Sequence, residues 1–307
     1  NIDTLFPLVG VYSSNVSVNF GQMRFKYPMP SGYAALNTTA LPAATIADGS
    51  DYFDAVLYTG NGGTKTISGL NFEGDLFWFK SRSASHDHWL FDRVRGLTKA
   101  MYSNGTSPEY DYSPNGVSAT SDTGFTLTSS GQTFNSNNVS YVGWAWDAGS
   151  STVSNTDGSI TSSVRANQTA GFSILTYTGT GSAGTVGHGL NAPPEMIILK
   201  GRNFSDNWRV YHKYLDSTEP EDYYLMLEST NAKSADQNAA FMNNTAPTNS
   251  VFSLGTDSAI NGSSQSMLAY CFAPVAGYSA FGSYEGNGSS DGPFQWCGFR
   301  PAVLLWK

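Results

Sequence analysis

Residues 57–80 read "LYTGNGGTKTISGLNFEGDLFWFK", and residues 176–200 repeat the pattern as "TYTGTGSAGTVGHGLNAPPEMIILK". A third copy begins at residue 283 as "SYEGNGSSDGPFQWCGFRPAVLLWK". In each copy a tyrosine (Tyr58, Tyr177 or Tyr284) precedes x-Gly-x-Gly, and an apolar segment ending in lysine follows. The tyrosines lie roughly 110 residues apart, which is the size of a domain and too long for a solenoid repeat.

Two of the copies also match at their ends. "GFTL" at 124–127 corresponds to "VFSL" at 251–254, and "SYVGWAWDAG" at 140–149 corresponds to "SMLAYCFAPVAG" at 266–277. The repeat predicts the following organisation: residues 1–50, different from the rest; 51–149, first repeat; 150–170, a linking hairpin that turns at Asp157-Gly158; 171–277, second repeat; 278–307, the start of a third repeat that is cut short.

The residue pattern of the repeated segments predicts β-strands. Runs such as "FDAVLYT" and "FSILTYT" are short, aromatic and β-branched, and they stop at Gly-x-Gly turns. Charged residues make up only 13% of the chain, which leaves little of the Lys and Glu that helices use. We therefore expect an all-β protein of tandem antiparallel β-sandwich modules, of jelly-roll or lectin-like type. Residues 229–244 have some helical spacing but are expected to form a loop.

Charge and cysteine content exclude several partners and compartments. The net charge of −8 argues against nucleic acid or anionic lipid as the main partner. No apolar run approaches the roughly 18 residues of a membrane span, so no membrane insertion is expected. Cys271 and Cys297 are predicted to be free thiols, which suits synthesis in a reducing cytoplasm.

Two motifs that could hold a cofactor or metal are interpreted as structural. Residues 179–184 match the dinucleotide pattern G-x-G-x-x-G, but the residues that follow, "TVGHGLNAPP", cannot form the helix that binds a pyrophosphate. His86 and His88 alternate along a predicted strand as zinc ligands can, yet the second repeat has no histidine there. No cofactor and no metal are expected.

Carboxylates that could hydrolyse a polysaccharide lie in predicted loops. Glu109 with Asp111 form one pair, and Glu219, Glu221 and Asp222 form a second cluster. Neither cluster is matched between the repeats, and no nucleophile motif such as G-x-S-x-G occurs. The sequence therefore predicts a protein that is not an enzyme and has no catalytic residues.

Binding of sugars is the remaining chemistry that the composition favours. Aromatic rings provide apolar platforms, and Asn, Asp and main-chain groups bond the hydroxyls around them. The chain has 17 Tyr, 18 Phe and 7 Trp. Trp89 and Trp208 occupy equivalent positions in the two repeats, although a repeated Trp also suits a core. The candidate ligand-binding residues are Arg82, Trp89, Tyr110, Tyr112, Arg202, Trp208 and Tyr223.

The N-terminal stretch and the repeats together resemble a known class of proteins. Residues 5–37, "LFPLVGVYSSNVSVNFGQMRFKYPMPSGYAALN", resemble the closing strands of a SPRY-like domain in phage structural proteins. The "YTGxG…GL" units resemble modules of tail-fibre and other surface proteins of tailed phages, particularly marine ones. The resemblance implies a virion surface location, on the tail or the capsid exterior, for a protein made in the cytoplasm of the bacterial host.

The expected function is host-cell attachment by a tail-fibre-type structural protein, through weak multivalent binding of surface glycans or another receptor. Sheet edges left open to pairing make a homotrimer a reasonable assembly. Two alternatives stay open. The modules could be capsid decorations or spacers that bind only other virion proteins, or, less in keeping with the sequence, the chain could be a polysaccharide depolymerase.

Overall fold

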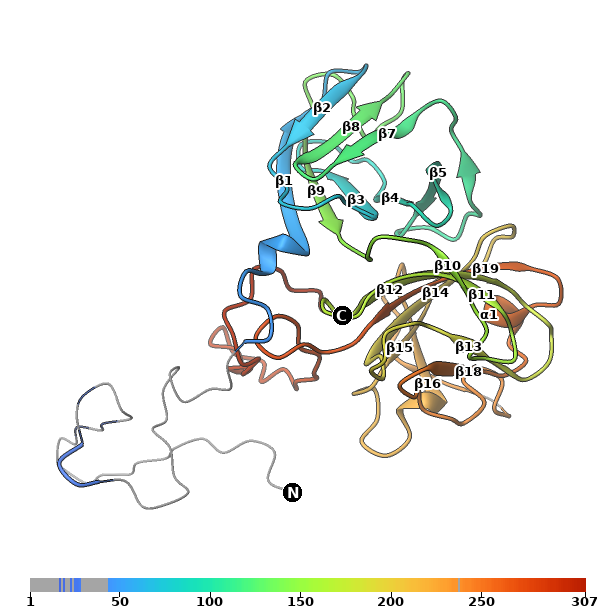
Figure 1. Cartoon of the computed structure of the whole chain (residues 1–307). Helices are drawn as coiled ribbons and strands as arrows, with labels where there is room; N and C mark the ends of the chain where they lie inside the picture. The colour runs from blue at the N-terminus through green and yellow to red at the C-terminus, as the bar shows by residue number, and fades with distance from the viewer. Residues whose placement is uncertain (1–16, 18, 20–22, 24, 29–43, 237) are drawn as a thin grey trace. The chain divides into compact units, whose positions relative to one another are not determined.

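The computed structural model describes residues 17, 19, 23, 25–28, 44–236 and 238–307 (Figure 1). Contacts divide the chain into two units, Asn1–Ala43 and Ala44–Lys307. Most of the SPRY-like resemblance falls outside the described residues. Within them, no helix has the length and hydrophobicity needed to cross a membrane. The second unit contains all the strands of the described part of the chain, and it is all-β and antiparallel in its sheets.

The first module comprises residues 53–146 and contains two sheets that enclose a core. The larger sheet has six strands in the order β1-β9-β3-β4-β5-β6, and the smaller has three in the order β2-β8-β7. The strands are β1 (Phe53–Thr59), β2 (Lys65–Ser68), β3 (Leu76–Ser81), β4 (Trp89–Asp92), β5 (Gly96–Tyr102), β6 (Tyr110–Asp111), β7 (Gly116–Ser121), β8 (Gly124–Thr128) and β9 (Ser140–Trp146).

The second module comprises residues 153–272 and repeats this design. Its larger sheet has the order β10-β11-β12-β19-β14-β15-β16-β17, and its smaller sheet pairs β13 with β18. The strands are β10 (Val153–Asn155), β11 (Ser162–Asn167), β12 (Phe172–Thr178), β13 (Gly184–Gly187), β14 (Met196–Gly201), β15 (Arg209–His212), β16 (Tyr223–Met226), β17 (Ser234–Ala235), β18 (Val251–Leu254) and β19 (Ser266–Phe272). Short helical turns are η2 (Gly49–Asp51), η3 (Pro220–Asp222) and α1 (Ser258–Asn261).

Strand order and register are the same in the two modules. The run β1-β9-β3-β4 corresponds to β12-β19-β14-β15, and Thr59 faces Ser140 as Thr178 faces Ser266. The repeated tyrosines of these strands are equivalent too. Tyr58 donates its hydroxyl to the carbonyl of Phe134 (2.6 Å), and Tyr177 donates to the carbonyl of Ile260 (2.7 Å).

Each module buries its own aromatic and aliphatic core between its two sheets. In the first module the core includes Phe77, Phe79 and Phe91, all fully buried. These side chains alternate along their strands with residues of the opposite face, as the two-residue period of a strand requires. β3 is nevertheless apolar at successive positions, because Leu76 on its other face is also buried, at 2% exposed.

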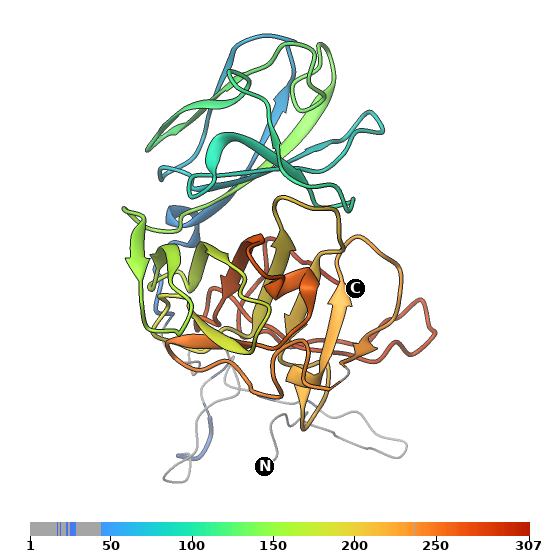
Figure 2. The ribbon, with the colours of Figure 1, turned by 90° about the vertical axis from the view of Figure 1, so that its right-hand side faces the viewer.

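That other face forms a joint between the modules. A third apolar cluster unites Leu76, Leu90 and Met101 of the six-stranded sheet with residues such as Ile198 and Leu268 of the eight-stranded sheet. The two large sheets therefore pack against each other, and the modules share a buried interface in addition to their separate cores (Figures 1 and 2). Burial on both faces explains why β3 and β14 begin with apolar residues at successive positions.

The segments outside the two repeats differ from each other in structure. β10 and β11 form a hairpin within residues 150–170, and its strands extend the eight-stranded sheet of the second module. Residues 280–307 contain no strand, and Tyr284 is 54% exposed. The apolar "AVLLWK" at 302–307 forms no strand, unlike the corresponding segments β3 and β14.

Candidate functional site

The Gly-x-Gly repeats are held by a buried asparagine in each module. Asn135 donates through Nδ2 to the carbonyl of Gly63 (2.8 Å) and accepts from the backbone of Asn61 (3.2 Å). Asn261 accepts from the backbone of Thr180 (2.9 Å) in the same way. Both asparagines are fully buried. The glycine-rich loops are therefore bound by their own module.

Close backbone approach accounts for the first glycine of each motif. A Cβ atom on Gly60 would lie 2.2 Å from the carbonyl oxygen of Ser136, and one on Gly179 would lie 2.3 Å from that of Gly262. Only glycine fits at such a distance. The G-x-G-x-x-G match at 179–184 leads into strand β13, so the structure gives it a turn and no phosphate-binding helix.

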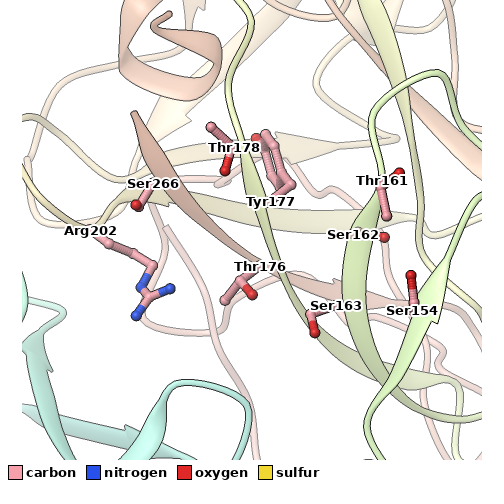
Figure 3. Close-up of a pocket in the computed structure, with 9 residues that line it drawn as sticks. All are labelled: Ser154, Thr161, Ser162, Ser163, Thr176, Tyr177, Thr178, Arg202 and Ser266. Atoms are coloured by element: carbon pink, nitrogen blue, oxygen red, sulfur yellow. The ribbon is translucent and has the colours of Figure 1, made fainter. Parts of the chain in front are cut away.

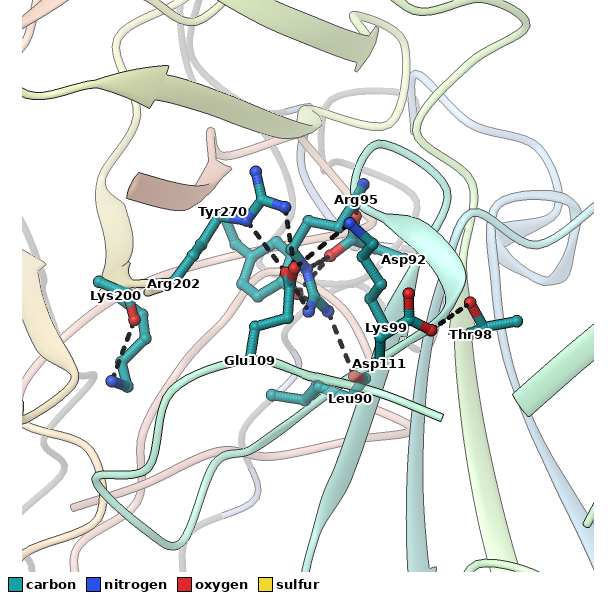
Figure 4. Close-up of polar contacts among 11 residues, drawn as sticks. Leu90, Asp92, Arg95, Thr98, Lys99, Glu109, Asp111, Lys200, Arg202 and Tyr270 are labelled. Atoms are coloured by element: carbon teal, nitrogen blue, oxygen red, sulfur yellow. Dashed lines mark hydrogen bonds and ion pairs between the residues drawn. The ribbon is translucent and has the colours of Figure 1, made fainter. Parts of the chain in front are cut away.

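Arg202, a candidate binding residue, is part of an ion-pair network at the joint (Figure 4). Its Nε and Nη2 donate to the two carboxylate oxygens of Glu109, each at 3.0 Å. Glu109 also contacts Arg95 (3.2 Å) and Lys99 (3.8 Å). Burial by itself raises the pKa of Glu109, but the hydrogen bonds from Arg202 and the nearby guanidinium charges outweigh it and lower that pKa. Glu109 is thus held ionised between the modules.

A second buried pair lies next to this network. Arg95 and Asp92 form a fully buried ion pair, and Tyr270 of the second module donates its hydroxyl to Asp92 at 2.9 Å. A buried ion pair needs further hydrogen bonds to offset the loss of water, and Tyr270 supplies one. The joint is therefore polar as well as apolar.

The repeated tryptophans are buried. Trp89 is 4% exposed and lies in the core of the first module, where its Nε1 donates to Thr133 (3.1 Å). Trp208 is fully buried at the joint and donates through Nε1 to the carbonyls of Tyr102 (3.0 Å) and Gly105 (3.1 Å). Neither ring offers a face to a ligand in this structure, because protein atoms cover both.

Tyr110 and Tyr112, in contrast, come together with a third tyrosine that the sequence did not single out. Tyr102 at the end of β5 lies 6.0 Å from Tyr110, ring centre to ring centre, and Tyr110 lies 6.1 Å from Tyr112. The hydroxyls of Tyr102 and Tyr112 are hydrogen-bonded to each other, and Tyr110 is 42% exposed. We call Tyr102, Tyr110 and Tyr112 the tyrosine edge.

The tyrosine edge is supported from beneath and flanked by polar groups. Trp89 contacts Tyr102 edge-on at 4.8 Å and Tyr112 at 5.1 Å, which fixes both rings. Asn104, two residues after Tyr102, donates to the carboxylate of Asp87 at 2.9 Å. Burial, followed by the hydrogen bond with Tyr112, raises the pKa of Tyr102, so its hydroxyl stays protonated. Partly exposed rings beside amide and carboxylate groups are the features that sugar recognition uses.

The other two candidate residues lie apart from this edge. Arg82 is exposed just after β3, and its backbone donates to Ser140 (2.7 Å). Tyr223 begins β16, with the ammonium of Lys233 4.0 Å from its ring centre. No ring contact or hydrogen bond found in residues 44–236 and 238–307 joins Arg82 or Tyr223 to the tyrosine edge.

The histidines beside the tyrosine edge have protein partners. His88 accepts from Trp78 Nε1 at 3.0 Å through Nδ1, and His86 lies 3.3 Å from the hydroxyl of Tyr141. Burial lowers the pKa of His88, which favours its neutral, accepting form. Among the described residues, no three His, Cys, Asp or Glu side chains are grouped as metal ligands.

Comparison with known proteins places the chain in one family. The family of a domain of unknown function (DUF7483) matches residues 48–307, and the chain belongs to it. Neither a search of curated proteins nor a search of solved structures returned a match. The family match spans both modules and the segment after them, so the two joined modules form one family domain.

Proposed function

We propose that this chain is a non-enzymatic adhesive protein of a phage tail fibre, and that its tyrosine edge binds glycans on the host cell surface. The observation that carries the proposal is the clustering of Tyr102, Tyr110 and Tyr112, with Tyr110 42% exposed. Virion location is supported by the resemblance of the repeats to phage surface modules. The proposed partners are a host glycan and the other proteins of the virion.

The ring geometry supports weak binding of a sugar. Tyr102 and Tyr112 are immobilised by Trp89 and by their own hydrogen bond, so little side-chain entropy is lost when a ligand binds. Only Tyr110 offers a large exposed face, and one such platform gives low affinity. We propose that a homotrimer and many copies per particle multiply this contact.

The state of the carboxylates supports a role without catalysis. Both oxygens of Glu109 are bonded to arginines, and Asp111 bonds Thr98 and the backbone of Ser113. A general acid needs a raised pKa, whereas the pKa of Glu109 is lowered by the network described above.

A matched pair of variants tests the sugar site. Tyr110 and Tyr214 are both 42% exposed, but Tyr214 lies in the second module, beside His212. On an array of uncharged glycans read with trimerised protein, Tyr110→Ala should sharply reduce binding while Tyr214→Ala leaves it unchanged. Equal loss in both variants, or undiminished binding of uncharged glycans by Tyr110→Ala, would contradict the proposal.

A second function, a spacer within the virion, is favoured by the buried joint. The ion pairs and apolar cluster between the modules fix their mutual orientation, as a rigid strut requires. A spacer would bind empty capsids or tails and would not adsorb to host cells. Locating the chain in intact particles by cryo-microscopy, together with a cell adsorption assay, distinguishes the two functions.

A further inference from the structure

A hollow of about 320 Å³ opens on the eight-stranded sheet beside the joint (Figure 3). Ile174 and Thr176 are two residues apart on β12, so their side chains lie on the same face of the sheet. Ile174 belongs to the apolar cluster at the joint, so the hollow lies on the face of the sheet that packs toward the first module. Its volume is at the small end of the range for small-molecule sites. The lining residues are Ser154, Thr161, Ser162, Ser163, Thr176, Tyr177, Thr178, Arg202 and Ser266.

Strand register places hydroxyl groups side by side across this sheet. Ser154 pairs with Ser163, Ser163 with Thr176, and on the next row Thr178 with Ser266. Neighbouring strands lie about 4.8 Å apart, and residues two apart on one strand lie about 6.8 Å apart. The hydroxyls therefore form a regular two-row array on one face.

These hydroxyls have no hydrogen-bond partner in the part of the chain that the structure describes. Among the described residues, no hydrogen bond involves the side-chain oxygen of Ser154, Ser163, Thr176, Thr178 or Ser266. Ser162 faces the opposite way and donates to the carbonyl of Gly187 at 2.8 Å. A hydroxyl can donate and accept at once, so the array can match a ligand that has both donors and acceptors.

Arg202 adds one positive group at the rim of the hollow. Figure 3 shows its guanidinium beside Thr176. Nε and Nη2 are engaged by Glu109, and of the bonds found among the described residues none involves Nη1. Glu109 shares its charge with Arg95 and Lys99, so it does not fully neutralise Arg202. Nη1 is thus a free, charged donor next to the hydroxyl array.

We propose that this hollow binds an acidic saccharide, with the sugar hydroxyls on the serine and threonine array and the anionic group on Nη1 of Arg202. A saccharide supplies closely spaced groups that both donate and accept, which a simple anion or an apolar ligand does not. A charged donor shortens and strengthens the bond to an anionic oxygen. The site is separate from the tyrosine edge, and its argument uses none of those residues.

The test is titration of the isotope-labelled protein with trigalacturonate, followed by NMR. The fully methyl-esterified trisaccharide keeps the hydroxyls and removes the charge, so it tests Arg202 without a substitution that would weaken the joint. Thr176→Val keeps the shape of the side chain and removes one hydroxyl of the array. Thr156→Val, in the β10–β11 turn, removes an exposed hydroxyl that does not line the hollow.

The expected result is a set of shifts on β11, β12 and β19, with a dissociation constant raised roughly fivefold by Thr176→Val and unchanged by Thr156→Val. The ester should bind more weakly than the acid, and the difference should shrink at high salt. Absence of shifts at the hollow, or equal binding of acid and ester, would overturn the proposal. Tyr110→Ala should not alter this titration. A failure of the proposal for the hollow can therefore be distinguished from a failure of the proposal for the tyrosine edge.

Discussion

Asn135 and Asn261 are the same residue of the repeat in structural terms: each is fully buried and binds the glycine-rich loop of its own module. Nδ2 of Asn261 bridges the carbonyls of Ser182 and Gly255, while its Oδ1 accepts from Thr180. Each asparagine thus pairs backbone groups that are at least partly buried. This contact explains why the loop sequence is kept in both modules.

Asn261→Ala should destabilise the protein by about 1–3 kcal/mol, because it leaves the buried carbonyl of Gly255 without the donor Asn261 and removes the bonds to Thr180 and Ser182. Urea denaturation followed by circular dichroism measures the change. Asn137→Ala is the control, since Asn137 is exposed and lies close to the equivalent loop of the first module. A loss of stability below about 0.5 kcal/mol for Asn261→Ala, the range of ordinary surface substitutions, would show that Asn261 does not hold the glycine-rich loop in place.

Tyr270→Phe should cost about 1.5–3 kcal/mol, because it removes the hydroxyl that donates to the buried carboxylate of Asp92 across the joint. Tyr211→Phe serves as the control: Tyr211 is 2% exposed, and its hydroxyl forms no hydrogen bond found among the described residues. The free energy of unfolding is obtained from denaturation curves of both variants.

The same curves test the joint itself. Because the modules share a buried cluster, unfolding should be a single transition when followed by either tryptophan fluorescence or circular dichroism. Two separate transitions in the unsubstituted protein would show that the modules are independent.

Lys200 should make stability rise with pH above neutrality. Its side chain is 1% exposed, and burial lowers its pKa to about 8, although Asp206 and Glu228 act in the opposite direction. Between about pH 8 and the ordinary lysine pKa near 10.4, the unfolded chain binds a proton that the folded chain has lost. Stability then increases with pH, by at most about 1.4 kcal/mol per pH unit.

The measurement is the difference in free energy of unfolding between the unsubstituted protein and Lys200→Met from pH 7 to 10. Subtraction removes the titration of the other groups, the tyrosines in particular. The difference should move in favour of the unsubstituted protein as pH rises. A flat difference would mean that Lys200 keeps its ordinary pKa in the folded state.

Forced trimerisation should increase apparent glycan affinity by about 10²- to 10⁴-fold, because the second and third contacts become intramolecular. Fusion to a trimeric coiled coil and surface plasmon resonance on an immobilised array ligand provide the comparison with monomer. The Tyr110→Ala trimer is the control, and its residual binding should equal that of the monomer variant. An equal affinity for monomer and trimer would contradict adhesion by avidity.

Much of the fold could be predicted from the sequence, because the strands follow short aromatic and β-branched runs that end at glycine. The matched pairs "GFTL" and "VFSL" are strands β8 and β18, and "SYVGWAW" and "SMLAYCF" are β9 and β19. The joint could not be predicted, since burial on a second face looks the same in one sequence whether a sheet or a partner chain covers it.

The candidate sites were less accessible to sequence reasoning. Trp89 and Trp208 were candidate ligand-binding residues because aromatic rings bind sugars. In the structure both are buried and belong to the apolar core. Tyr102 was missed because it ends a strand and joins Tyr110 and Tyr112 only through the β5–β6 pairing. The only local indication of Tyr102 in the sequence was that a polar residue, Asn104, follows it two positions later. Hydroxyl arrays such as the one at Thr176 depend on register, which serine and threonine content alone does not specify.

The back-to-back packing of the two large sheets has a consequence for how such proteins change between generations. Domains that fold independently can be exchanged at the segment that connects them. A module that shares a buried surface with its neighbour cannot be exchanged in this way. A recombinant that receives a foreign second module would expose Leu76, Leu90 and Met101 to water unless the incoming sheet carries matching side chains. Inheritance of the pair as a block is the simplest route that keeps both halves soluble.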